Sequence, residues 1–103
     1  AVVHLGVAYG TDMEKVEEVV NGVGDAMYAD PDWNAKVMEP PRYVGITAFN
    51  DSDITFRAMF KTHTFENWGA EREFNRRIKV AFEAASIEIP FPQREVHLIS
   101  DNA

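Results

Sequence analysis

The stretch Ser-Ile-Glu-Ile-Pro-Phe-Pro-Gln-Arg-Glu-Val-His, residues 86–97, decides how this chain can end its fold. Pro90 and Pro92 stand one residue apart, which forbids a helix and removes two backbone donors from any sheet. A stiff, extended connection must therefore follow the element that ends before it. That connection fixes the direction in which the chain leaves, and we expect a short strand over residues 95–99.

Helical periodicity precedes this connection. Residues 65–85 place apolar side chains on one stripe, which predicts a helix with Phe74, Ile78, Ala81, Phe82 and Ala85 facing inward. Its other face is charged. Glu73 and Arg77 stand four residues apart in the favourable order, so Arg72, Arg76, Arg77 and Lys79 indicate a solvated helix face more than a binding patch.

Two strands joined by a polar turn come before that helix. Residues 43–49 and 54–62 are typical of strands, and the turn over residues 50–53 predicts a hairpin. In the second strand Ile54, Phe56, Ala58 and Phe60 lie on one face, which is the pattern of a sheet covered on one side. Residues 29–41 contain three prolines and form a connection that can pack through Trp33 and Val37.

The first strand and helix are the clearest local pattern. Alternating residues predict a strand that begins near Val3 and ends at Gly10. Thr11 and Glu14 then form a capping box, with Thr11 as the N-cap of a helix that ends between Gly24 and Tyr28. The order strand, helix, strand, strand, helix, strand predicts an α+β, ferredoxin-like βαββαβ fold. This fold is one antiparallel sheet with two helices on one face, and residues 1–103 form a single domain.

Composition narrows the class of protein. The chain has 103 residues, of which 46% are hydrophobic, and no apolar run approaches the roughly 20 residues of a membrane span. With 17 acidic against 10 basic residues, the net charge of −7 disfavours nucleic acid and an anionic membrane surface as partners. The absence of cysteine excludes disulfides and thiol catalysis. The chain opens at Ala1 in a strand-like pattern, without an initiator Met, so we interpret it as part of a longer protein.

No residue pattern indicates catalysis, a cofactor or a metal. His4, His63 and His97 have no metal-ligand spacing and no nucleophile arrangement beside them. Residues 30–41 begin like a calcium loop, but they place Ala and Pro where Gly and Glu are needed. Asp51 and Asp53 flank a hairpin turn and are interpreted as turn residues.

Two other functions share the predicted topology. RNA binding through Phe56 and Phe60 would need a basic chain and a Lys/Arg-Gly opening of that strand, and both are missing. An acylphosphatase-like enzyme would need Arg and Asn at a phosphate-cradling loop, where Asp12 stands in the first loop instead. A regulatory module that binds a small ligand between copies remains an alternative.

Two motifs suggest a family. The run Tyr9-Gly10-Thr11-Asp12 follows the first strand, and Pro90-Phe91-Pro92-Gln93 follows the second helix. Together with Trp68, Glu73-Phe74-Asn75 and residues 78–82 between them, they resemble the cytoplasmic C-terminal domain of the small-conductance mechanosensitive channel (MscS) family. The resemblance covers nearly the whole chain, from about residue 3 to residue 98.

This resemblance implies a function and a place in the cell. Members of the family release solutes through a membrane pore on osmotic downshock. They are homo-oligomers, heptamers in the best-known branch, with a hollow vestibule at the cytoplasmic face of the inner membrane. The chain would be part of the vestibule wall, with no enzyme activity and no cofactor, acting in subunit assembly and in filtering ions and small solutes. The domain would make no contact with the membrane. Residues 94–103 would leave the domain and form a strand that pairs with other subunits.

Two positions depart from the family pattern. Ser86 stands where Gly usually closes the second helix, so a left-handed cap there would cost on the order of 1 kcal/mol more. Gly10 replaces a more usual polar residue and adds flexibility at the entrance of the first helix.

Overall fold

Alternating apolar residues build an antiparallel sheet in the computed structural model, which describes residues 2–63 and 65–90. Within these residues the sheet has three strands, β1 (Val2–Ala8), β2 (Arg42–Phe49) and β3 (Asp53–Met59), in the order β1-β3-β2. The register places Val3 opposite Ala58 and Val7 opposite Ile54, so the apolar residues of both strands share one face.

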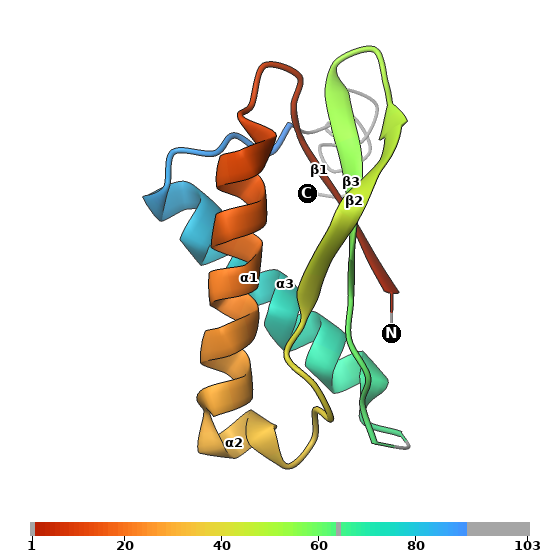
Figure 1. The fold of residues 1–103 in the computed structure, drawn as a ribbon, viewed down its shortest axis with the longest axis vertical. Coiled ribbons are helices and arrows are strands. Elements are labelled where there is room, and N and C mark those ends of the chain that lie inside the picture. The colour runs from red at the N-terminus through yellow and green to blue at the C-terminus, as the bar shows by residue number, and fades with distance from the viewer. Residues whose placement is uncertain (1, 64, 91–103) are drawn as a thin grey trace, which may run out of the picture.

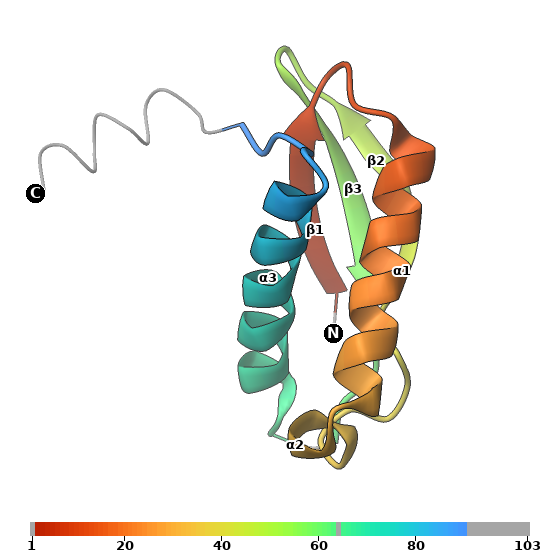
Figure 2. The ribbon, with the colours of Figure 1, turned by 90° about the vertical axis from the view of Figure 1, so that its left-hand side faces the viewer.

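Two long helices cover that face. They are α1 (Met13–Ala29) and α3 (Asn67–Ala84), and Figures 1 and 2 show both on the same side of the sheet. Phe56 at the centre of β3 is fully buried, with its ring 6.4 Å from Phe82 of α3 and 5.4 Å from Tyr43 of β2. The predicted α+β fold with two helices on one face is thereby confirmed. The predicted strand over residues 95–99 lies outside the described residues.

The start of α1 differs from the prediction. Thr11 is not the N-cap, because Asp12 takes that place with an extended backbone, and its Oδ1 accepts a hydrogen bond of 3.0 Å from the Glu14 N–H. Asp is as good a cap as Thr. Thr11 instead donates its backbone N–H to the Ala8 carbonyl at 3.1 Å, which closes a tight turn after β1.

The end of α1 also differs, because the helix runs one residue past the predicted range, to Ala29. Gly24 lies inside this helix. This residue is buried, and a Cβ atom added there would lie 2.0 Å from the Pro41 carbonyl oxygen. The glycine therefore lets the segment before β2 approach the helix.

The long connection after α1 packs as predicted and also contains a short helix, α2 (Pro31–Asn34). Asp30 ends α1 and caps α2, since its Oδ1 accepts a bond of 2.9 Å from the Asp32 N–H. Val37 is buried and pairs with Thr62, while Trp33 is half-buried against the core. The connection thus forms one end of the molecule, which Figure 1 shows at the bottom.

Candidate functional site

The turn between β1 and α1 carries the first of the two motifs. Asp12 caps the helix, and its carbonyl accepts a bond of 3.1 Å from the Val16 N–H. Tyr9 lies on the surface, with its ring 6.4 Å from that of Phe49 in an edge-on contact. Gly10 is exposed too, and a Cβ atom there would meet no other atom within 4 Å.

The C-terminal end of α3 leads into the second motif through a left-handed residue. Ser86 has φ 60°, and its N–H bonds to the Glu83 carbonyl at 3.2 Å. The Ile87 N–H bonds to the Phe82 carbonyl at 2.8 Å, which completes a Schellman motif. Ile87 is also buried in the core. The departure from glycine at Ser86 therefore does not prevent a left-handed cap.

These two segments, which we call the signature end, lie side by side. The Ala8 N–H donates a hydrogen bond of 3.0 Å to the Glu88 carbonyl, and Ala8 immediately precedes the first motif. An open cavity of about 460 Å³ separates the two segments, with Thr11, Asp12 and Lys15 on one side and Ser86 and Glu88 on the other.

The predicted site residues do not all lie at the cavity of the signature end. Gly10, Thr11 and Asp12 line the cavity, whereas Tyr9 contacts the hairpin. Pro90 is half-buried two residues after Glu88. Phe91, Pro92 and Gln93 lie outside the described residues. The bonds at this end act mainly on the backbone, so the arrangement is suited to aiming the chain beyond α3.

Side chains in the described ranges form no group of three His, Cys, Asp or Glu that could hold a metal ion. His4 and His63 are both exposed, and His97 lies outside those ranges. Asp53 accepts a bond of 2.7 Å from the Asn50 side chain within the hairpin turn. Asp53 thus has a structural role at the hairpin turn.

A second cluster of charged residues joins the helices at the opposite end. Arg77 Nε lies 2.6 Å from Glu73 Oε2, as its spacing predicts, and Arg77 Nη2 reaches Asp30 Oδ2 at 2.5 Å. The Arg77 side chain is only 20% exposed. The interpretation of Arg77 as part of a solvated face was wrong, because its guanidinium bridges α3 to the corner between α1 and α2. Sequence alone did not pair residues 47 positions apart.

These contacts change the acidity of both carboxylates. The pKa of Glu73 is lowered to about 2, chiefly by its hydrogen bonds from Arg76. Burial of the carboxylate opposes this shift, and the hydrogen bond from Arg77 adds to it. The pKa of Asp30 is also lowered, first by its bond from the Asp32 N–H and then by Arg77. Both carboxylates therefore stay ionised well into the acid range.

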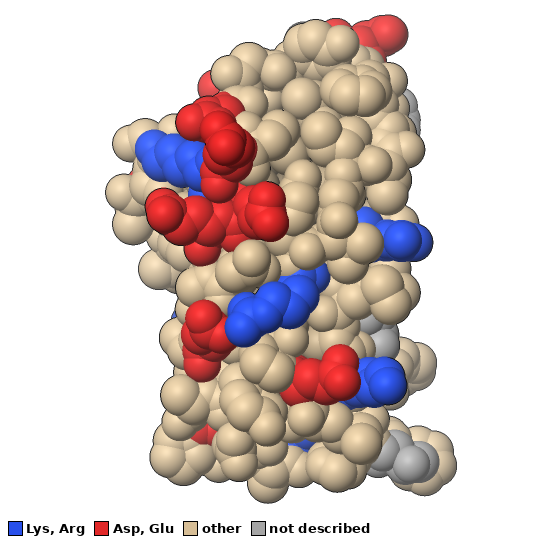
Figure 3. Space-filling model, in the orientation of Figure 1, with Lys and Arg blue, Asp and Glu red and all other residues tan. Residues whose placement is uncertain are grey.

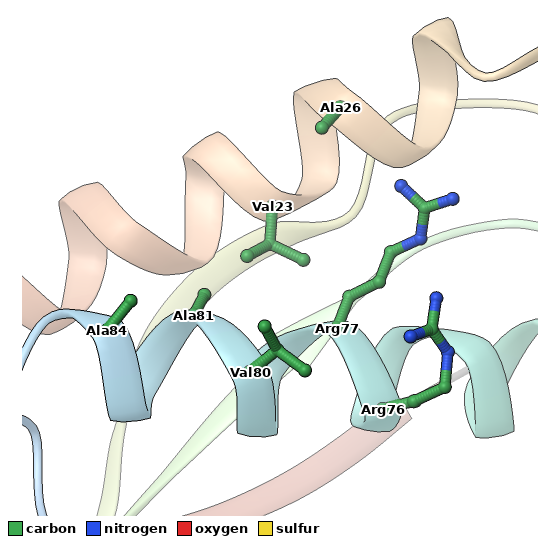
Figure 4. Close-up of a pocket in the computed structure, with 7 residues that line it drawn as sticks. All are labelled: Val23, Ala26, Arg76, Arg77, Val80, Ala81 and Ala84. Atoms are coloured by element: carbon green, nitrogen blue, oxygen red, sulfur yellow. The ribbon is translucent and has the colours of Figure 1, made fainter.

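A groove of about 410 Å³ lies beside this cluster between α1 and α3. Figure 4 shows Val23 of α1 and Val80 of α3 directed into the space between the helices, with Arg77 extending from α3 toward α1. Acidic residues gather elsewhere. Figure 3 shows them over the first half of α1, where Glu14, Glu17 and Glu18 are exposed.

The described helices include none that is both long and apolar enough to cross a membrane.

Sequence comparison finds proteins that are similar to this chain. The chain spans about a third of the length of the curated relatives it matches. One is a small-conductance mechanosensitive channel of Caldanaerobacter subterraneus subsp. tengcongensis, 28% identical over 95% of this chain and 34% of its own length. Another, from Helicobacter pylori, has the same name and is 33% identical over 88% of this chain and 31% of its own.

A protein-family model described as the C-terminal part of the mechanosensitive ion channel MscS matches residues 1–89. This match takes in β1, both long helices and the connection as far as Ile89. By that match the chain belongs to the family of MscS C-terminal domains.

Proposed function

We propose that this chain forms part of the wall of a cytoplasmic vestibule in a homo-oligomeric channel that releases solutes on osmotic downshock. The observation that carries the proposal is the family match over residues 1–89, together with the relatives named small-conductance mechanosensitive channel. In this proposal the domain assembles subunits and filters solutes, and sensing of membrane tension belongs to other parts of the protein.

The geometry of the signature end supports a role in assembly. The Schellman motif and the bond from Ala8 to Glu88 fix the backbone just before Pro90. A proline at this position restricts the preceding residue to extended conformations, so the direction of the leaving chain is limited as well. Figure 2 shows residues 86–90 leaving α3 at the end of the molecule where the β1–α1 turn also lies. Tyr9, Gly10, Thr11 and Asp12, with Pro90, Phe91, Pro92 and Gln93, are the residues that we assign to assembly.

Survival of osmotic downshock tests the function. The full-length parent is expressed in bacteria that lack their own mechanosensitive channels, and its membrane insertion is verified. Rescue above the vector control is the expected result. A well-inserted parent that gives no rescue would contradict a tension-gated release channel.

The role in assembly has its own variant. Ala8→Pro removes the N–H that bonds to Glu88, and a proline is tolerated where the N–H of an edge strand faces away from its partner. We expect the detergent-solubilised parent with this substitution to lose its oligomeric mass, measured by light scattering, while Gly22→Ala in α1, where an added Cβ atom meets nothing within 4 Å, keeps it. If both variants kept the same oligomeric mass, the signature end would have no role in assembly. A mass of seven subunits for the unmodified parent is expected from the family resemblance.

The filtering role follows from charge. The net charge of −7 and the carboxylates exposed on α1 would attract cations if they face a shared vestibule. Reversing Glu14, Glu17 and Glu18 to Lys should shift the reversal potential of the parent channel toward anions. An unchanged reversal potential would exclude these side chains from ion selection.

A further inference from the structure

The face of the sheet away from the helices carries an arginine whose Nε has no hydrogen-bond partner. Arg57 stands between Phe56 and Ala58, which are buried beneath the helices, so strand alternation places Arg57 on the opposite, open face. Figures 1 and 2 show that no described helix covers that face. The Arg57 Nε atom is nonetheless buried, and no group of the described residues accepts a hydrogen bond from it. A buried donor without an acceptor is destabilising, so this one indicates an acceptor on another molecule.

Other arginines of the described residues have partners or lie in water. Arg42, Arg76 and Arg77 each pair with a carboxylate. Arg72 is exposed on α3, where water can solvate it. In a chain with 17 acidic and 10 basic residues, a half-buried guanidinium that forms no ion pair with a described carboxylate is unexpected. The charge of Arg57 is therefore available to an anionic ligand.

The register of the sheet identifies the neighbours of Arg57. His4 of β1 lies directly opposite Arg57, and Gly45 of β2 lies opposite it on the other side. Side chains that face each other across strands lie close enough to act together, and the His4 imidazole adds an N–H donor beside the guanidinium. Gly45 has φ 158°, and a Cβ atom there would meet nothing within 4 Å. The backbone beside Arg57 is therefore open to the close approach of a ligand.

Apolar side chains adjoin these donors at one end of the open face. Val2 and Met59 pair across the strands, and Met59 lies two residues after Arg57 on the same face. Val44 stands next to Gly45 at a bulge of β2. Val2 and Met59 are 43% exposed and Val44 is 46% exposed. Because the outer face of an antiparallel sheet is normally polar, these residues indicate contact with an apolar group.

The other end of the open face carries a carboxylate. Asp53 accepts a hydrogen bond of 2.7 Å from the Asn50 side chain, and its Oδ2 would lie 3.2 Å from a Cβ atom at Gly6. This carboxylate would repel an anion beside it. A ligand anchored at Arg57 should therefore extend in the opposite direction, toward Val2.

We propose that the open sheet face binds a small organic carboxylate that has an apolar body. We call the residues that would hold it the open-face site; they are Val2, His4, Val44, Arg57 and Met59. The carboxylate would lie between Arg57 and His4, and the guanidinium would turn so that Nε and one Nη donate to its two oxygens. The proposal goes beyond the channel function and does not depend on it. A second copy of this chain that offers a surface carboxylate is the competing occupant.

NMR titration of the 103-residue chain tests the proposal, with the backbone amide shifts as the readout and sodium 4-methylpentanoate as the probe. Two control ligands separate its parts, since 4-methylpentanamide has the same body without the charge and acetate has the charge without the body. We expect saturable shifts in β1 and β3 around His4 and Arg57. Each control ligand should bind about tenfold more weakly, or less.

A pair of variants locates the site. Arg57→Gln removes the charge and should weaken binding of 4-methylpentanoate about tenfold or more. Arg72→Gln removes the same charge at an exposed position of α3 and should leave binding unchanged. The amide spectrum of each variant without ligand verifies that it is folded.

Three results would overturn the proposal. Equal binding of the amide would reduce the site to apolar contact, and equal weakening by both substitutions would show non-specific attraction of anions. Shifts of the same residues that grow with protein concentration in the absence of ligand, without further change on adding the probe, would assign the face to a second copy. Because the titration does not require an open pore, it can fail or succeed independently of the downshock assay.

Discussion

The two ends of this domain are held together by different interactions. At the signature end, residues 8–12 and 86–90 are joined by the backbone hydrogen bond from Ala8 to Glu88, and the side chain of Ile87 is buried in the core. At the other end, α2 and the segment up to Pro41 are held by Arg77 with two carboxylates and by the approach of Pro41 to Gly24. Backbone bonds and apolar burial do not titrate, whereas ion pairs do. Acid should therefore destabilise the α2 end, whereas the signature end should be destabilised by substitutions that change the size of its side chains.

The largest expected effect is at the signature end. Ile87 is 5% exposed and packs in the core beyond the end of α3. Ile87→Ala should lower the free energy of unfolding by about 3 kcal/mol, from lost burial and the cavity left behind. Urea unfolding followed by circular dichroism measures the change. Val80→Ala, at a position 56% exposed on α3, is the control and should change stability by less than about 1 kcal/mol. Equal losses for the two variants would mean that Ile87 does not anchor this end.

The next effect tests the close approach at the α2 end. Gly24→Ala would place Cβ 2.0 Å from the Pro41 carbonyl oxygen, so the backbone must move, and we expect a loss of about 2–3 kcal/mol. Gly22→Ala is a matched control two residues earlier in α1, where a Cβ atom meets nothing within 4 Å. That substitution should gain about 0.5–1 kcal/mol from helix propensity alone. Opposite signs in urea unfolding are expected, and a gain at both positions would show that Pro41 yields easily.

Acid should weaken the α2 end selectively. The pKa of Glu73 is about 2 in the folded chain and 4.5 as its ordinary value, so its stabilisation is complete above pH 4.5 and is lost as pH falls toward 2. With solvent screening this amounts to about 1–2 kcal/mol. Glu73→Gln should remove that part of the pH dependence in urea unfolding between pH 6 and pH 2.5.

The same helix supplies the control for this comparison. Glu83 pairs with Lys79 at 3.0 Å, but both side chains are 65% exposed, against 14% for Glu73 and 20% for Arg77. Glu83→Gln should leave the acid dependence within about 0.5 kcal/mol of the original. If both variants flattened the acid dependence equally, the pairing of Glu73 with Arg76 and Arg77 would matter no more than the exposed pair.

Sequence reasoning worked where the signal is local. The period of two in β3 placed Ile54, Phe56 and Ala58 on the buried face, and the pattern of α3 placed Phe74, Ile78 and Phe82 there. At the end of α3 the sequence indicated only what a left-handed cap at Ser86 would cost, and the structure shows that Ser86 adopts this conformation. Local periodicity and capping chemistry thus determine most of the element order.

Contacts between distant segments escaped prediction. The pairing of Arg77 with Asp30 depends on how α1 and α3 cross, which no spacing within either helix reveals. Gly24 did carry a signal. It continues the four-residue spacing of Val16 and Val20 on the inner face, and a buried glycine in a helix indicates close approach of another backbone. For the signature end, the motifs were identified as sequence, but the bond from Ala8 to Glu88 that joins them depends on the tertiary fold.

The smallest expected effect returns to the signature end and tests its cap. Ser86 has φ 60°, which costs a side chain with Cβ about 1 kcal/mol and costs glycine almost nothing. Ser86→Gly removes that cost but also gives the unfolded chain more freedom, so the net gain should be about 0.5–1 kcal/mol. Ala85→Gly, one residue earlier at φ −92°, relieves no strain and should lose stability. Opposite shifts of the urea midpoint would show that the signature end holds its shape against local strain. A loss at both positions would mean that the Ser86 side chain itself stabilises the turn, and that the departure from glycine is a gain at this end.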